Sequence, residues 1–228
     1  MRKINKSPDV PATLVGATEP TSATGVLATI YKADDVRKQL LEDQHFKCAY
    51  CECDLNCQYN DVEHYRPKSQ YYWLGHEWNN LLYACNLCNR TFKKAQFPLK
   101  DETKKVVAPS SLIQEEPLIV NPVVCDPSIH IKFRRYEAVG MTPEGIKTIE
   151  IFHLNDRNAR VKLISGREEL YELYTKEENK KKIAQVALLN GKMSQDVYDL
   201  LISLCDESLS ILKSTSHEFS GMLISQIN

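Results

Sequence analysis

The chain has 228 residues, of which 43% are hydrophobic and 26% charged, and its formal net charge is −1. This length allows one hydrophobic core or two small ones, and the composition excludes a disordered or collagen-like chain. No apolar run approaches the roughly 20 residues of a membrane-spanning helix, so no membrane contact is expected. A solitary DNA-binding protein usually carries a basic excess. The near-neutral charge therefore predicts that any nucleic-acid contact uses a local patch or a partner.

The N-terminal segment is basic at its start but has no continuous apolar stretch, because prolines interrupt it at Pro8, Pro11 and Pro20. A signal peptide is therefore not expected, and the predicted location is cytoplasmic. The chain has eight cysteines, and in a reducing compartment the paired ones are better interpreted as metal ligands than as disulfides.

In chain order, residues 1–30 lack a clear period and predict an extended arm, and residues 33–45 have the spacing of an amphipathic helix. A cysteine-rich region follows up to about Pro98. Residues 129–140 and 146–155 alternate and are rich in β-branched and aromatic residues, with turn residues between them, which predicts a β-hairpin. The remainder is helical in pattern, with helices expected at roughly 157–174, 177–190, 194–213 and 216–227.

Four cysteines form two C-x2-C pairs, Cys48 with Cys51 and Cys85 with Cys88. Two such turns complete a tetrahedral zinc shell with Zn–S distances of about 2.3 Å and no open coordination position. The pairs therefore predict a structural Zn²⁺ site that also contributes folding energy.

The ligand set has alternatives, because Cys53 or Cys57 could replace a member of the first pair. We favour Cys48 and Cys51, since the spacing Cys51-Glu-Cys53 is tight for a zinc knuckle. Cys125 and Cys205 are expected to pack as small apolar residues.

Between the two pairs, and directly after the second, lie residues suited to phosphodiester hydrolysis. His64 has the residue type for activating water near neutral pH. Glu63 and Asn89 offer the oxygen ligands that a hard ion such as Mg²⁺ prefers. Because adjacent side chains on a strand point to opposite faces, Glu63 and His64 are expected to divide the roles of metal ligand and base. Asn80 could brace the His64 loop by hydrogen-bonding its backbone.

The arrangement C-x2-C, E-H-Y-R-P and N-L-L-Y-A-C-x2-C-N resembles the zinc-containing HNH (ββα-metal) nucleases. The resemblance implies that His64 is the general base and that Asn80 is the middle asparagine that holds the loop. Asn89 stands where the last histidine usually lies, and Glu63 replaces the more usual aspartate. Both replacements keep an oxygen donor.

The flanking segments are similar to one branch of that family, the HNH nuclease subunits of Septu-type antiphage systems, which are also found as retron effectors. The similar segments are residues 1–4, 48–52, 61–98, 121–122, 126–127 and 154–155. This resemblance implies a partner ATPase and action against phage-related nucleic acid, most simply DNA, with RNA as the other possibility.

Five basic residues near these motifs are candidate phosphate contacts: Arg66, Lys68, Arg90, Lys93 and Lys94. The alternative for the last three is a solvated helix face. Asp61 is either a residue that orients His64 or a turn residue. His76 is most simply a residue without a site role.

We therefore expect an α+β protein. A ββα-metal nuclease core with a structural zinc site, at about 31–100, is wrapped by the N-terminal arm and followed by a β-hairpin and a C-terminal helical module. The expected domains are 1–110 and 111–228. Two alternatives to this metal-dependent endonuclease are a non-catalytic zinc module that binds nucleic acid or protein, and a solitary restriction-type HNH nuclease.

Overall fold

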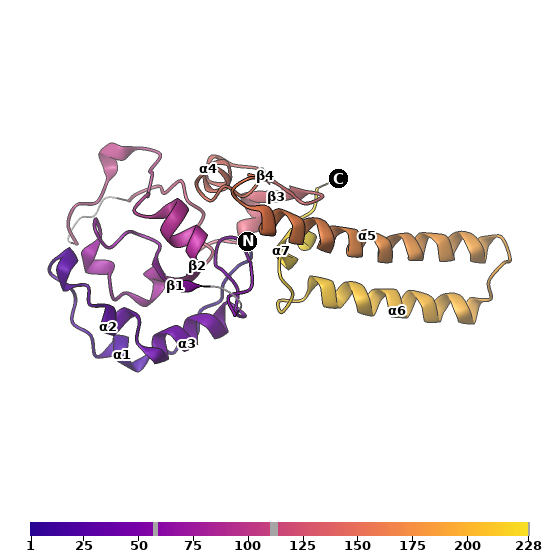
Figure 1. Ribbon diagram of the computed structural model, residues 1–228, viewed down its shortest axis with the longest axis horizontal. Helices are drawn as coiled ribbons and strands as arrows, with labels where there is room; N and C mark the ends of the chain where they lie inside the picture. The colour runs from indigo at the N-terminus through magenta and orange to yellow at the C-terminus, as the bar shows by residue number, and fades with distance from the viewer. Residues whose placement is uncertain (57–58, 110–113, 228) are drawn as a thin grey trace.

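The computed structural model describes residues 1–56, 59–109 and 114–227, and Figure 1 shows their arrangement. Cys57 and the expected domain boundary between residues 110 and 111 lie outside the described residues. Residues 1–154, here called the N-terminal body, gather on one side, and two long antiparallel helices project from them (Figure 1). No helix of the described part is both long and apolar enough to cross a bilayer.

The N-terminal arm is less extended than its sequence predicts, because it contains short helical turns. These are α1 (Ala12–Val15), η1 (Ala23–Gly25) and α2 (Ala28–Tyr31). The helix expected at 33–45 is confirmed as α3 (Asp34–Asp43). Its first turn carries two acidic residues that favour a helix N-terminus, and its apolar face is buried through Val36 and Leu40.

The cysteine-rich region forms an antiparallel strand pair followed by a helix. Strand β1 (Asn60–His64) pairs with β2 (Leu81–Cys85), with Asn60 opposite Cys85 and His64 opposite Leu81. The helix after β2 is η4 (Leu87–Lys93), which has the wide turn of a π-helix. Short 3₁₀ turns lie between and beyond these elements: η2 (Tyr72–Leu74), η3 (Trp78–Asn80), η5 (Glu102–Lys104) and η6 (Pro127–Ile129).

The second strand pair is shorter than the expected hairpin. Strands β3 (Ile131–Arg134) and β4 (Glu137–Gly140) both come from the first predicted segment, and the prediction of a strand at 146–155 is wrong. That segment belongs to α4 (Pro143–Ile151), because Thr142 accepts a hydrogen bond from Gly145 as an N-cap and Pro143 occupies the first turn.

The C-terminal region is helical, as expected, with different boundaries. The helices predicted at 157–174 and 177–190 form one helix, α5 (Val161–Leu189), because neither Gly nor Pro occurs between Gly166 and Gly191. The prediction at 194–213 is confirmed by α6 (Gln195–Lys213). The last helix, α7 (Ser220–Ile224), is shorter than predicted.

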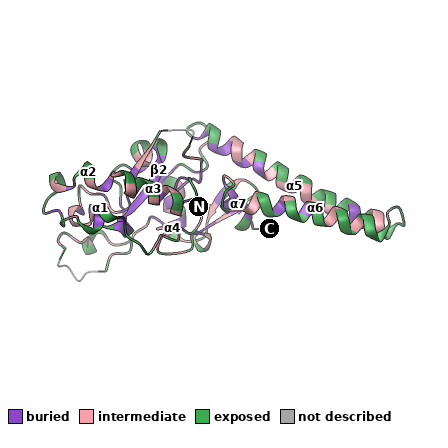
Figure 2. Ribbon diagram, turned by 90° about the horizontal axis from the view of Figure 1, so that it is seen from below, coloured by how far each residue is buried: buried purple, intermediate pink, exposed green. Residues whose placement is uncertain are grey.

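One cluster of buried residues runs through the N-terminal body and the start of the hairpin. It joins residues on both sides of the expected domain boundary, such as Leu82, Phe133, Phe152 and Leu170. The outer halves of α5 and α6 carry few buried residues (Figure 2). The α5–α6 hairpin is therefore supported at its base and by its own helix–helix contact.

Candidate functional site

Four cysteine sulfurs meet beside the β1–β2 pair. The Sγ atoms of Cys48, Cys51, Cys53 and Cys85 all lie within 4.8 Å of one another, and those of Cys51 and Cys85 are 3.7 Å apart. Tetrahedral ligands at a Zn–S distance of about 2.3 Å are separated by about 3.8 Å. The cluster is therefore consistent with a structural zinc site, and three of the four predicted ligands belong to it.

Cys53 completes this group, so the reason for disfavouring it was wrong. Glu52 adopts a left-handed backbone conformation with φ of 62°, which turns the chain between the two cysteines. The Sγ atoms of Cys51 and Cys53 consequently lie 3.3 Å apart despite the tight spacing. The other alternative ligand, Cys57, lies outside the described residues.

The fourth predicted ligand, Cys88, is buried next to the group but is not part of the mutually close set. Its sulfur contacts those of Cys48, Cys51 and Cys85, and it accepts a hydrogen bond of 2.9 Å from Arg160 Nη2. Cys48, Cys51 and Cys85 are thus common to two possible four-sulfur sets, one completed by Cys53 and the other by Cys88.

The pKa values of the thiols in this cluster are shifted in opposite directions. Burial raises the pKa of Cys48 and Cys88, whereas hydrogen bonds from Cys48 lower the pKa of Cys51 and Cys85. Zinc binds thiolates, so binding of the ion would release the protons that burial retains.

His64 is the last residue of β1 and is only 6% exposed. Its Nε2 lies 2.9 Å from the carbonyl oxygen of Gly75. Because a carbonyl only accepts, Nε2 carries the proton and Nδ1 keeps its lone pair. Burial lowers the pKa of His64 to about 4, so the ring is neutral at pH 7. The edge of the Tyr31 ring lies against it, with centroids 4.6 Å apart.

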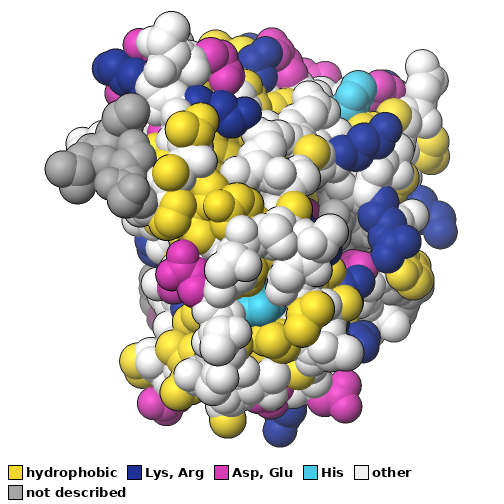
Figure 3. All heavy atoms as spheres, turned by 90° about the vertical axis from the view of Figure 1, so that its left-hand side faces the viewer, with side chains coloured by type: hydrophobic (Ala, Val, Ile, Leu, Met, Phe, Trp, Pro, Cys, Tyr) yellow, Lys and Arg dark blue, Asp and Glu magenta, His cyan; other side chains and the backbone are white. Residues whose placement is uncertain are grey.

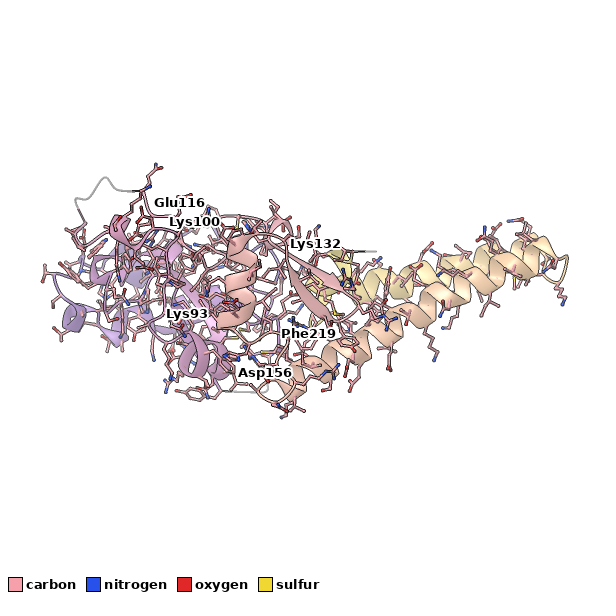
Figure 4. All side chains as sticks on the ribbon, turned by 90° about the horizontal axis from the view of Figure 1, so that it is seen from above. Lys93, Lys100, Glu116, Lys132, Asp156 and Phe219 are labelled. Atoms are coloured by element: carbon pink, nitrogen blue, oxygen red, sulfur yellow. The ribbon has the colours of Figure 1, made fainter. Side chains whose placement is uncertain are left out.

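Glu63 points to the opposite face of β1, where its carboxylate forms a buried ion pair. Lys93 Nζ lies 2.5 Å from Glu63 Oε1 and also donates to the carbonyl oxygen of His64 at 2.9 Å. Lys93 is fully buried and Glu63 is 3% exposed. Burial raises the pKa of Glu63, and the ammonium group of Lys93 opposes this shift. Figure 4 labels Lys93 on its helix in the N-terminal body.

This arrangement does not fit the predicted Mg²⁺ ligands. The carboxylate of Glu63 is engaged by Lys93 through Oε1. Asn89 donates through Nδ2 to the carbonyl oxygen of Val62 at 3.4 Å, and this bond does not use Oδ1, the atom that would bind a cation. Within residues 1–56, 59–109 and 114–227, the cysteine cluster is the one set of three or more Cys, His, Asp or Glu side chains close enough to hold a metal. Lys93, rather than a divalent ion, thus compensates the charge of the Glu63 carboxylate.

Asn80 connects the two loops that meet at His64. Its Oδ1 accepts from the backbone N–H of Arg66 at 2.8 Å, and its Nδ2 donates to the carbonyl oxygens of Arg66 and Leu74 at 3.1 and 3.0 Å. Arg66 follows His64 by two residues, and Leu74 precedes the Gly75 carbonyl that holds the His64 ring. The side chain therefore joins the backbone on both sides of the histidine.

Three of the five predicted phosphate contacts are already engaged within the protein. Lys93 is inaccessible, so its burial contradicts a direct phosphate contact. Arg66 pairs with buried Glu115, and Lys68 Nζ donates to the hydroxyl of Tyr31 at 2.9 Å.

The remaining two, Arg90 and Lys94, are exposed. Arg90 forms an ion pair of 2.8 Å with Asp61, which also pairs with Lys32 at 2.6 Å. Asp61 therefore contacts these two basic residues instead of orienting His64. Figure 3 shows Lys and Arg side chains gathered along one edge of the end remote from the hairpin.

Sequence reasoning missed four participants: the Lys93 ion pair, the Tyr31 ring, the Gly75 carbonyl and Arg160. Lys93 lies four residues after Asn89, so helical spacing could have placed both on one face towards β1. The other three contacts join segments far apart in the chain. No local pattern marks a backbone carbonyl or a distant arginine as part of a site.

An antiparallel strand pair, a following helix and a cysteine cluster beneath them define this chain as an α+β protein with a candidate zinc-stabilised site. No family model matches the sequence. The chain is homologous to Septu protein PtuB of Bacillus mycoides, with 35% identity over 56% of this chain and 49% of that protein. It is also similar to Septu protein PtuB of Bacillus thuringiensis, with 36% identity over 58% of this chain and 46% of that protein.

The resemblance to Septu proteins found in the sequence is thus confirmed. The chain spans about half the length of the curated relatives it matches.

Proposed function

We propose that this chain is an HNH-type endonuclease that hydrolyses phosphodiester bonds in nucleic acid, with DNA as the favoured substrate. The observation that carries the proposal is the state of His64. A carbonyl fixes its proton on Nε2, so the neutral ring keeps a basic Nδ1 at the end of β1. The C-x2-C and E-H-Y-R-P patterns, which resemble those of HNH nucleases, support the same conclusion.

In the proposed reaction, His64 Nδ1 accepts a proton from water as the water oxygen attacks phosphorus. The bond from phosphorus to the leaving oxygen then breaks, that oxygen takes up a proton from solvent water, and His64 returns its own proton to solvent. Asn80 holds the loop on both sides of the base, through Arg66 and Leu74. Because His64 is 6% exposed, substrate reaches it only after a covering group such as Tyr31 moves. Contact with water would then bring its pKa back towards 6.5, closer to the working pH.

A bound Mg²⁺ would supply positive charge that offsets the negative charge of the phosphate group. Glu63 and Asn89 are the ligands proposed from the sequence, but the ion pair between Glu63 and Lys93 does not fit this role. We therefore assign no step to the ion. Dependence of cleavage on Mg²⁺ is left to the assay.

We further propose that the chain acts in a Septu-type antiphage system and assembles with an ATPase. The proposal rests on the named relatives and on the surface of α6. Large apolar side chains on this helix are exposed at helical spacing: Val197, Leu200, Leu204 and Ile211. Such a stripe is suited to burial against another protein. Co-purification of an ATPase with the tagged chain from its own host is the test, and recovery of the chain alone would favour a solitary nuclease.

The decisive variant is His64→Ala, assayed with DNA and RNA substrates, with and without Mg²⁺ and with any co-purifying ATPase. The variant should keep its fold and zinc content and lose cleavage by 1,000-fold or more, on the order expected for loss of a general base with its oriented water. His153→Gln, at a half-exposed histidine, is the matched control and should cleave normally. Wild-type cleavage by His64→Ala would refute the role of His64.

One structural observation favours an alternative function, a non-catalytic zinc module that binds nucleic acid or protein. The observation behind it is that Glu63 and His64 are both buried and hydrogen-bonded. This alternative predicts nucleic-acid binding without cleavage under every assay condition, and equal binding by the wild-type protein and by His64→Ala.

A further inference from the structure

The loop Gly75–His76 lies between His64 and the N-terminal arm. On one side, the Gly75 carbonyl accepts the hydrogen bond from His64 Nε2. On the other side, Gly75 packs so closely on Val26 that an added Cβ would lie 2.5 Å from both Val26 methyl groups. The backbone that sets the His64 tautomer is therefore in direct contact with the arm.

His76 uses both ring nitrogens to bind the arm. Nδ1 lies 3.1 Å from the Thr18 carbonyl oxygen, and the backbone N–H of Leu27 donates to Nε2 at 3.2 Å. A carbonyl only accepts and an N–H only donates, so the ring is neutral with its proton on Nδ1. Its side chain is buried, with a residue exposure of 9%. Two backbone segments of the arm are thereby tied to the residue after Gly75.

The arm returns from these contacts to His64. Tyr31 ends α2, is 5% exposed and lies with its ring edge against His64. Its hydroxyl accepts a hydrogen bond from Lys68, and the next residue, Lys32, pairs with Asp61 on β1. The arm therefore contacts His64 in two ways: indirectly through His76 and Gly75, and directly through Tyr31.

We propose that His76 is a positioning residue for His64. It holds the Gly75 carbonyl in place, and so keeps the His64 proton on Nε2 and the lone pair on Nδ1. The catalytic consequence rests on the proposed function, whereas the structural consequence does not. When the arm is released, the Gly75 carbonyl is free to shift, and part of the His64 population moves its proton to Nδ1.

Three substitutions separate the contributions of ring shape and hydrogen bonding. His76→Phe keeps a ring and removes both hydrogen bonds. His76→Asn keeps a donor near the Nδ1 position, and His76→Gln keeps an acceptor near the Nε2 position. His76→Phe should have the largest effect and the two amides intermediate ones. If His76→Phe fails to fold, the amide variants carry the test.

The readout is the side-chain ¹⁵N–¹H correlation spectrum of the ¹⁵N-labelled full-length protein, with His64 assigned from the spectrum of His64→Gln. Wild-type His64 should give the Nε2–H pattern, and His76→Phe should show a mixture of tautomers. Hydrogen exchange of the Leu27 amide should accelerate at least tenfold, because its acceptor is lost. His153→Gln should change neither signal.

In the cleavage assay, kcat should fall by about 10- to 100-fold, the range for a displaced supporting group, with KM within about twofold of wild type. An unchanged His64 tautomer in His76→Phe would overturn the proposal, even if Leu27 exchange accelerates, because the arm contact would then not act on His64. A shifted tautomer in a protein that cleaves nothing even as wild type would uphold the positioning role and refute the nuclease proposal alone.

Discussion

The N-terminal body buries charged side chains, whereas the α5–α6 hairpin exposes apolar ones. Lys93 and Glu63 are sealed inside the body as an ion pair, while Ile183, Leu189 and Leu200 on the hairpin are 69%, 78% and 63% exposed. Figure 2 shows that much of the surface of α5 and α6 is exposed. Burying charge costs free energy unless the partners are well placed, and exposing apolar surface forgoes the hydrophobic gain. The N-terminal body therefore positions polar groups near His64 at a cost in stability. The hairpin leaves apolar surface available for association.

The largest expected effect is loss of the cysteine cluster. Cys51 belongs to both possible zinc sets, so Cys51→Ser should abolish tight zinc binding and remove a contribution on the order of 10 kcal/mol to folding. Zinc content by metal analysis and thermal unfolding of the full chain measure this. The control is Cys205→Ser, a buried cysteine on α6, which should keep one zinc ion. Equal zinc content in both variants would exclude a zinc site at the cluster.

The same assay separates the two possible fourth ligands. Replacing the true ligand by serine should weaken zinc binding strongly, and replacing the other cysteine should leave most of it. The comparison is Cys53→Ser against Cys88→Ser, with zinc affinity measured by competition with a chelator. The contact between Arg160 and Cys88 predicts a second difference, since Cys88→Ser also removes the acceptor of that guanidinium group.

The next effect concerns the buried ion pair. Lys93→Met leaves the Glu63 carboxylate without its partner and should destabilise the protein by about 3–5 kcal/mol, as measured by denaturant unfolding. The neighbouring Lys94 is exposed, so Lys94→Met should change stability by about 0.5 kcal/mol or less. Similar stabilities for the two variants would show that the pair does not hold the body together.

A smaller effect should follow pH. The pKa of His64 is about 4 in the folded state because of burial, and about 6.5 when the chain is unfolded. Between these values the unfolded state binds more protons, so stability is fully present above pH 6.5 and falls as the pH drops towards 4. The wild type should lose up to about 3 kcal/mol more than His64→Gln across this interval. Parallel pH profiles of the two proteins would contradict a buried neutral His64.

The smallest effect is expected on the outer surface of the hairpin. Leu200→Ser removes an exposed apolar side chain and should change the stability of the isolated chain by about 0.5 kcal/mol or less. Leu209→Ala, at a position that is 5% exposed on the same helix, should cost about 2–5 kcal/mol. If Leu200→Ser is as costly as Leu209→Ala, the α6 stripe is covered in the free protein. The proposed association surface would then be lost.

Local patterns with one physical cause were predictable from the sequence. The spacing of Val36 and Leu40 located α3, and the two C-x2-C pairs located three sulfurs of the cluster. Cys53 was named only as an alternative ligand, because its place in the cluster depends on the left-handed conformation of Glu52, which the spacing of cysteines does not encode.

The strand predicted at 146–155 failed for a different reason. The isoleucine spacing in this segment fits a helix as well as a strand. The N-cap Thr142 and Pro143 in the first turn favour the helix. Within the site, residue types identified His64 and Asn80 as candidates. Their partners came from distant segments, as the carbonyl of Gly75 and the ring of Tyr31 do, and only tertiary structure brings these together.

The contact between Arg160 and Cys88 connects the base of the α5–α6 hairpin to the cysteine cluster. Arg160 immediately precedes α5, whose 29 residues extend about 43 Å from that point. The helix therefore begins at a contact with the cysteine cluster and ends far from it. A protein bound near Leu189 at the far end would therefore be connected to the cysteine cluster through the full length of α5. Because Cys88 lies on η4 beside Asn89, small rotations of the hairpin would be felt first by the helix that faces β1.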